Sequence, residues 1–260
     1  MAALRAEDII KSTIPDLKLG QWHTEHSAIH NLRYLGELRP WRTFAAEAWR
    51  HSRDTDWAAH PDVLAHGPWG PVPAHSLFNE HVWVGDETGV QGRFTNNIGQ
   101  AVSAACRVFG LDIAFADFRA SNAVMGGWVP DSGCITAAGE LRGVGEDKVG
   151  WVPAHSLTDA VEEGGRYLRK VVGQIARYLR LGQVRYGFLT TYDETIFLRQ
   201  VKSRGGVWRL EYSEPIRHDA RAGQNSGEIT LREAFWYFAA KAAGAGFQTD
   251  IDVKMENWVR

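Results

Sequence analysis

Two carboxylates and one cation lie close together in the middle of the sequence, with a spacing that suits a divalent metal ion. Asp131 follows Pro130 at the start of one predicted strand, and Glu140-x-Arg142 closes the next. Residues two apart on a strand share a face, so Glu140 and Arg142 would face one site within reach of Asp131. Asp131 and Glu140 would then suit Mg²⁺, which prefers oxygen ligands and can activate a water against a phosphoryl group.

Other polar residues follow in an order that could complete such a site. Gln174 and Tyr178 are four residues apart and would share one face of a helix. Thr190, Asp193 and Glu194 fall at a predicted strand turn, where they serve either the turn itself or the polar wall of a pocket.

A run of basic residues contains no acid between its first and last members, and it predicts a local phosphate-binding surface. The alternative is an ordinary solvated helix face. The residues are Arg166, Arg169, Lys170, Arg177, Arg180 and Arg185.

The elements that must position these residues are predicted from apolar periodicity. An apolar stripe from Phe94 to Phe109 indicates a helix that ends at Gly110. A longer stripe indicates one continuous helix over 158–181, and Thr230 with Glu233 forms a capping box for a last helix to about residue 243. Strands are predicted over 111–118, 134–142, 184–192, 195–201 and 207–212, with a glycine-rich loop over 143–150.

The first 86 residues are irregular and rich in tryptophan and proline, with one helix predicted over 43–50. We expect residues 1–86 to wrap a core formed by residues 87–260. His23, His26 and His30 have a spacing that would align three imidazoles for zinc on a helix, but no apolar helical pattern surrounds them.

Composition excludes several classes of protein. The chain has 260 residues and a net charge of −2, so any nucleic-acid partner must be held by a local patch. Cys106 and Cys134 are the only cysteines, which argues against a disulfide scaffold or a cysteine-rich zinc site. No apolar run approaches the length of a membrane span, and the start does not read as a signal peptide. We expect a soluble cytoplasmic protein with no membrane partner.

Taken in order, these motifs resemble the PD-(D/E)XK nuclease-like superfamily, and within it the nuclease-like proteins of fungi. The resemblance implies a restriction-endonuclease-like α/β core with a central mixed sheet flanked by helices. It also implies that Glu87 is the helix-borne acid of the site, and that Arg142 replaces the lysine that positions the attacking water. Arginine is larger and does not lose its proton, which puts hydrolysis in doubt. The matching segments are Pro130-Asp131, Gly139 to Arg142, Gln174 to Tyr178, Tyr186 to Tyr192 and Thr195 to Leu198.

Two functions are compatible with this scaffold, besides a relative that only binds nucleic acid. The replaced lysine favours an aminoacyl-tRNA-dependent synthase of secondary metabolism, similar to fungal arginine-containing cyclodipeptide synthases, which needs no cofactor. Glu140, Asp131 or Glu194 would hold the arginyl guanidinium, and Tyr178 or Glu87 would relay protons. The alternative is a Mg²⁺-dependent nuclease that uses Asp131 and Glu140 as metal ligands.

Overall fold

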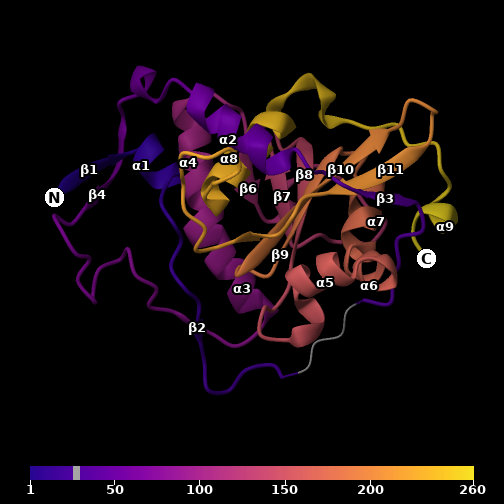
Figure 1. Cartoon of the computed structure of the whole chain (residues 1–260), viewed down its shortest axis with the longest axis horizontal. Coiled ribbons are helices and arrows are strands. Elements are labelled where there is room, and N and C mark those ends of the chain that lie inside the picture. The colour runs from indigo at the N-terminus through magenta and orange to yellow at the C-terminus, as the bar shows by residue number, and fades with distance from the viewer. Residues whose placement is uncertain (26–29) are drawn as a thin grey trace.

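The computed structural model describes residues 1–25 and 30–260, and its centre is one mixed eight-stranded sheet (Figure 1). The strand order is β3-β11-β10-β9-β8-β7-β6, and β12 pairs with β10. β8 runs parallel to β9, and β11 runs parallel to β3. The predicted α/β class with a mixed central sheet is therefore confirmed. The strands are β3 (Glu37–Pro40), β6 (Ala114–Ala116), β7 (Ser132–Ile135), β8 (Leu141–Asp147), β9 (Tyr186–Thr190), β10 (Glu194–Lys202), β11 (Trp208–Tyr212) and β12 (Ile216–Arg217).

Helices cover both faces of this sheet and bury a separate core on each (Figure 1). On one face, aromatic rings from the sheet and from α8 interlock, with Phe188 and Phe235 5.0 Å apart between ring centroids. That face is covered by α1 (Ala6–Ile10), α2 (Phe44–Asp54), α3 (Glu87–Phe94), α4 (Gln100–Val108) and α8 (Leu231–Ala243). The other face is covered by α5 (Leu157–Glu163), α6 (Gly165–Val171), α7 (Gly173–Leu181) and α9 (Met255–Trp258).

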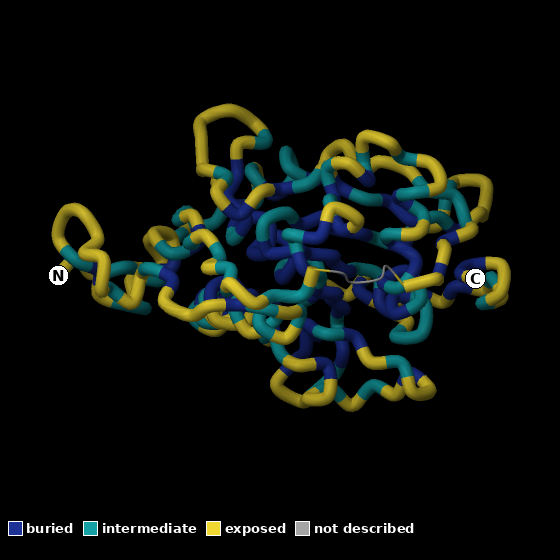
Figure 2. The backbone as a smooth tube through the Cα atoms, turned by 90° about the horizontal axis from the view of Figure 1, so that it is seen from below, coloured by how far each residue is buried: buried dark blue, intermediate teal, exposed yellow. Residues whose placement is uncertain are grey.

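The first 86 residues are part of the main architecture as well as a wrap around it. β3 pairs with β11 at the edge of the large sheet, and α2 packs against α8. Two small sheets lie outside it, one of β1 (Ala2–Arg5) with β4 (Val63–Gly67) and one of β2 (Lys18–Leu19) with β5 (Trp83–Val84). In Figure 2 the buried residues lie at the centre of the molecule, and the N-terminal region with β1 and β4 extends away from them.

The helix predicted over residues 158–181 is three shorter helices, α5, α6 and α7. Gly164 interrupts the first two with a φ of +59°, a left-handed conformation that continues no α-helix. Gly173 begins α7 against the chain at Leu32, where a Cβ would lie only 2.3 Å from the Leu32 carbonyl oxygen. The basic residues of this stretch therefore do not share one straight helix.

The predicted glycine-rich loop over residues 143–150 is wrong, because most of it forms the second half of β8. Glycine is needed here because aromatic rings press onto the strand. A Cβ on Gly145 would lie 2.1 Å from the Phe188 ring, and one on Gly143 would lie 3.0 Å from the Phe238 ring. These glycines mark close packing inside a strand, and β8 consequently extends to Asp147.

Two predictions for helices are confirmed. The Thr230 and Glu233 side chains form the expected capping box at the start of α8. The apolar stripe that ends at Gly110 becomes α3 and α4, joined by a π-helical turn over Thr95–Gly99. Among the residues that the structure describes, no helix combines the length and the apolar character needed to cross a bilayer.

Candidate metal centre

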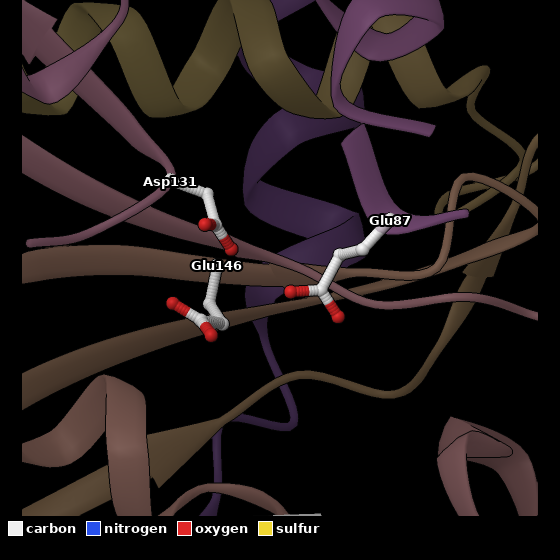
Figure 3. Close-up of side chains that lie close together, drawn as sticks. All are labelled: Glu87, Asp131 and Glu146. Carbon is white, nitrogen blue, oxygen red and sulfur yellow. The ribbon is translucent and has the colours of Figure 1, made fainter. Parts of the chain in front are cut away.

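Three carboxylates from three separate segments converge at one end of the sheet. Glu87, Asp131 and Glu146 each offer an oxygen atom, and these atoms all lie within 4.8 Å of one another. Figure 3 shows that the three side chains lie close together and come from the start of α3, from the bend before β7 and from the end of β8. This is the one group of metal-ligating side chains found among residues 1–25 and 30–260.

Antiparallel pairing of β7 with β8 brings Asp131 and Glu146 together. Ser132 lies opposite Gly145, so the residue before β7 meets the residue near the end of β8. The Asp147 backbone N–H donates to Asp131 Oδ2 at 2.9 Å, and the Gln91 side chain on α3 donates to the Asp131 carbonyl. Hydrogen bonds from β8 and from α3 thereby fix the turn that carries Asp131.

Glu87 is placed by the start of α3. Asp86 caps that helix, because its side chain accepts the Gly89 N–H at 2.9 Å. Glu87 follows directly in the first turn, and its carboxylate reaches the ammonium of Lys148. This position at the start of α3 agrees with the expectation that Glu87 is a helix-borne acid.

Lys148 lies at the centre of the cluster, one residue beyond β8. Its Nζ is 2.6 Å from Glu146 Oε1 and 3.2 Å from Glu87 Oε1, and it also donates to the Asp147 carbonyl at 3.0 Å. Its backbone N–H donates to the Thr190 carbonyl at 2.8 Å, which continues the β8–β9 pairing by one residue. The ammonium is therefore fixed by the sheet and is 15% exposed.

Burial and the opposite charges together set the pKa values in this cluster. It raises the pKa of the Glu146 carboxyl well above the usual range, and Lys148 offsets only part of that effect. Burial also raises the pKa of Glu87, with Lys148 again acting in the opposite direction. For the Lys148 ammonium, burial lowers the pKa, but Glu146 and Glu87 together raise it above the ordinary value. Acidic oxygens and one ammonium are thus held at close range in a poorly hydrated place.

The donor set fits a hard divalent cation. Glu146 is 2% exposed, and its Oε2 atom is buried without a hydrogen-bond partner among the described residues. Buried carboxylate oxygens are rarely left without partners, so this atom indicates a missing ligand. Three carboxylates suit Mg²⁺ or Mn²⁺, which prefer oxygen ligands. Glu87, Asp131 and Glu146 would hold such an ion.

Glu140 and Arg142 do not belong to this cluster, which corrects the prediction that they share a site with Asp131. Glu140 closes the turn between β7 and β8, while Asp131 lies at the opposite end of the same strand pair. Six residue steps separate Glu140 from Glu146, which is about 20 Å along a strand. The two predicted residues instead pair with each other at 2.6 Å, and the Arg142 guanidinium lies 3.9 Å from the Phe247 ring centroid.

Gln174 and Tyr178 do lie beside the cluster, on α7. Gln174 lines the same pocket as Glu146 and Lys148, and its amide donates to the Tyr178 hydroxyl at 2.9 Å. That hydroxyl donates in turn to the Val129 carbonyl at 3.2 Å, two residues before Asp131. Burial raises the pKa of Tyr178 to about 12. Tyr178 is therefore a positioning residue for the Asp131 turn, which differs from the expected proton relay.

The predicted polar wall of Thr190, Asp193 and Glu194 is used mainly for structure. Thr190 is buried, and its hydroxyl bonds to that of Thr195 at 2.7 Å. The Glu194 carboxylate caps α5, where it accepts the Leu157 and Thr158 backbone N–H groups. Asp193 Oδ1 lies 3.7 Å from His218 Nδ1. None of the three belongs to the metal-ligating group found among the described residues.

Several of the predicted phosphate-binding arginines are anchored to the protein itself. Arg169 donates to the Tyr34 and Gly36 carbonyls, and Arg180 donates to the Val253 carbonyl. Arg177 lies over the Trp128 ring at 4.3 Å, and Arg185 is half-buried. Arg166 and Lys170 remain exposed, and Lys170 lines the pocket beside Glu146 and Lys148. The basic surface is consequently smaller than predicted, but one of its members borders the cluster.

Of the three histidines with the spacing of a zinc site, His26 lies outside the described residues. His23 Nδ1 is 2.8 Å from the Gly20 carbonyl oxygen, and His30 packs 5.7 Å from the Trp128 ring.

Sequence reasoning missed Glu146 and Lys148, although a signal was present. Glu146-Asp147-Lys148 follows Asp131 and has the same acid-x-base spacing as Glu140-Leu141-Arg142, with lysine in the basic position. The glycines on either side made this segment resemble a loop. A search for acid-x-lysine after Asp131 would have found it.

Comparisons with protein-family models, with curated proteins and with solved structures found no match.

Proposed function

We propose that this protein is a phosphodiesterase that cleaves nucleic acid with the help of a divalent cation. One observation carries the proposal: Glu87, Asp131 and Glu146 offer oxygens within 4.8 Å of one another, and Lys148 Nζ contacts two of these acids. Three carboxylates can hold a divalent cation, and the cation and the ammonium together can stabilise the negative charge on a phosphate while a water attacks.

The cation would supply polarisation of a phosphoryl oxygen and a lowered pKa for a bound water. Glu87, Asp131 and Glu146 would hold it, and Gln91 and Tyr178 keep the Asp131 turn in place. Lys148 presents a compact ammonium at 2.6 Å from Glu146, where it can orient a water and balance charge on the phosphate. Gln174 and Lys170 border the same pocket and would contact substrate phosphate.

The structure also changes how the resemblance to the PD-(D/E)XK superfamily is interpreted. With Glu146 and Lys148 in place of Glu140 and Arg142, the acid-x-lysine element is intact. Its residues lie beside Asp131 and the helix-borne Glu87. Membership of the superfamily is therefore better supported with Glu146 and Lys148 than with Glu140 and Arg142. Every residue type of the motif is then present, including the lysine.

The synthase expectation relied in part on replacement of the lysine by Arg142. That support no longer applies, because Lys148 provides the ammonium at the carboxylates. Diketopiperazine formation from charged tRNA stays a separate prediction. It is tested by incubating the protein with charged tRNA alongside the cleavage assay.

The test measures cleavage of single-stranded and plasmid DNA and of RNA with Mg²⁺ or Mn²⁺, and with EDTA as the metal-free control. We expect cleavage with the cation, and Asp131→Asn or Glu146→Gln should lower its rate at least about a hundredfold, since an ion contributes several kcal/mol to the transition state. Glu140→Gln is the matched control and should keep full activity. Absence of cleavage, or equal activity of Glu146→Gln, would refute the proposal, as would diketopiperazine formation as the sole reaction.

A further inference from the structure

We infer that the substrate strand is unpaired at the site and that its bases stack on Trp22 and Trp83. This inference rests on the proposed function and specifies its substrate. Trp22 is 89% exposed and Trp83 is 68% exposed, whereas Trp41, Trp236 and Trp258 are almost fully buried. An indole left in water forgoes the stabilisation of its large apolar surface, so two exposed indoles near one site call for a partner.

Trp83 is aimed outward by a short strand that leads into the candidate centre. β2 and β5 pair in parallel, with Lys18 opposite Trp83 and Leu19 opposite Val84. Val84 is 2% exposed, and side chains alternate along a strand, so Trp83 faces away from the core. Trp83 precedes Glu87 by four residues, which limits the distance between their Cα atoms to about 14 Å.

Trp22 is held in a turn that is fastened to the same segment. The Gly20 N–H donates to the Val84 carbonyl and the Thr24 N–H donates to the Gly85 carbonyl, both at 2.8 Å. A Cβ on Gly85 would lie 3.1 Å from the Trp22 carbonyl oxygen, so the two chains are in close contact. The turn therefore presents Trp22 beside residues 84–85, directly before the helix that carries Glu87. The backbone that carries Trp22 is thus already ordered before a strand binds, which lowers the entropy cost of binding.

Stacking on these indoles requires an unpaired strand. In a duplex the faces of each base are covered by its neighbours, whereas a single strand can turn its bases onto aromatic rings. The charge pattern agrees with a strand that passes the cluster. Lys18 Nζ lies 5.9 Å from the Trp83 ring centroid, and Lys170 borders the pocket that contains Lys148. Because the net charge of the chain is −2, stacking must supply affinity that a basic protein would obtain from phosphates.

The experiment separates base stacking from charge by comparing two strands with equal numbers of phosphates. One is dye-labelled oligothymidine, and the other is a strand of the same length built from stable tetrahydrofuran abasic units. Fluorescence anisotropy is measured with Ca²⁺ to slow hydrolysis. We expect the wild type to bind oligothymidine at least about fivefold more tightly than the abasic strand, since each stacked base contributes at least that factor.

Trp22→Ala or Trp83→Ala should remove most of this difference, and Trp22→Phe should keep much of it. Trp69→Ala is the matched control, because Trp69 is 78% exposed but follows β4, away from this turn. Equal affinity of the wild type for the two strands, or an unchanged difference in both alanine variants, would overturn the inference. A change in oligomeric state of Trp22→Ala with unchanged base dependence would overturn it too, in favour of a protein partner.

Hydrolysis of the abasic strand with Mn²⁺ distinguishes this inference from the proposed function. The cluster acts on the phosphodiester, so we expect the wild type and the control variant Trp69→Ala to cleave the abasic strand at similar rates. Cleavage without any base dependence of binding would overturn the stacking inference alone. Failure of the wild type to cleave either strand would overturn the proposed function, on which the inference rests.

Discussion

Lys148 and Arg142 show how much depends on which basic residue lies beside the acids. The Lys148 ammonium contacts Glu146 and Glu87, whereas the Arg142 guanidinium contacts Glu140 and Phe247. Lys148→Met should therefore lower cation-dependent cleavage about a hundredfold or more, because the charge on the phosphate loses its nearest ammonium. Arg142→Lys should leave the rate unchanged. Initial rates with a labelled oligonucleotide at saturating Mn²⁺ measure both effects.

Thermal unfolding of both variants shows whether either change merely unfolds the protein. Near wild-type cleavage by folded Lys148→Met would contradict the role of the ammonium. Faster cleavage by Arg142→Lys would instead return the motif to its original assignment at Glu140 and Arg142.

Neighbouring basic residues on α6 have different roles, because one stabilises the fold and the other is free to contact substrate. Arg169 on α6 donates to the Gly36 carbonyl at 2.7 Å, while its neighbour Lys170 is exposed beside the pocket. Arg169→Glu should lower the free energy of unfolding by about 1–3 kcal/mol, because two partly buried carbonyls lose their donor. Lys170→Glu should change stability by less than about 0.5 kcal/mol. Urea unfolding measures both values.

The affinity for a single strand should depend on Lys170, although the stability of the protein does not. Lys170→Glu should weaken single-strand binding and reduce the slope of its dependence on log salt concentration by about one, since one phosphate contact is lost. Arg166→Glu, at another exposed residue of the same helix, is the control for a general charge effect. If the salt slope is the same in Lys170→Glu and the wild type, Lys170 does not contact phosphate.

The candidate centre links segments that are far apart in the chain, so a bound cation should stabilise the whole fold. Glu87 lies on α3, Asp131 precedes β7 and Glu146 lies on β8. An ion that binds only the native protein adds about 2.7 kcal/mol at a hundred times its Kd. That corresponds to a rise in Tm of about 5 to 10 °C for a protein of this size.

Differential scanning calorimetry with Mn²⁺, against a potassium salt at matched ionic strength, measures this rise. Glu146→Gln should abolish it, and Glu140→Gln should retain it. An equal rise in both variants would mean that the ion binds elsewhere.

Much of the fold was predictable because its signals are local. The Thr230 and Glu233 capping box and the apolar stripe that ends at Gly110 depend on neighbours within one or two helical turns, and both are confirmed. Asp131, Gln174 and Glu87 were also found from sequence, and the structure places all three at or beside the cluster.

The remaining half of the site depended on contacts between distant residues. Gly143 and Gly145 indicate a loop when only their neighbours in sequence are considered. In the fold they are strand residues, because the Phe238 and Phe188 rings occupy the space that side chains would fill. Those rings are more than 40 residues away along the chain, so no local pattern extends β8 to Asp147. The pairing of β7 with β8 then determines that Asp131 meets Glu146 and Lys148, because antiparallel strands bring the start of one to the end of the other.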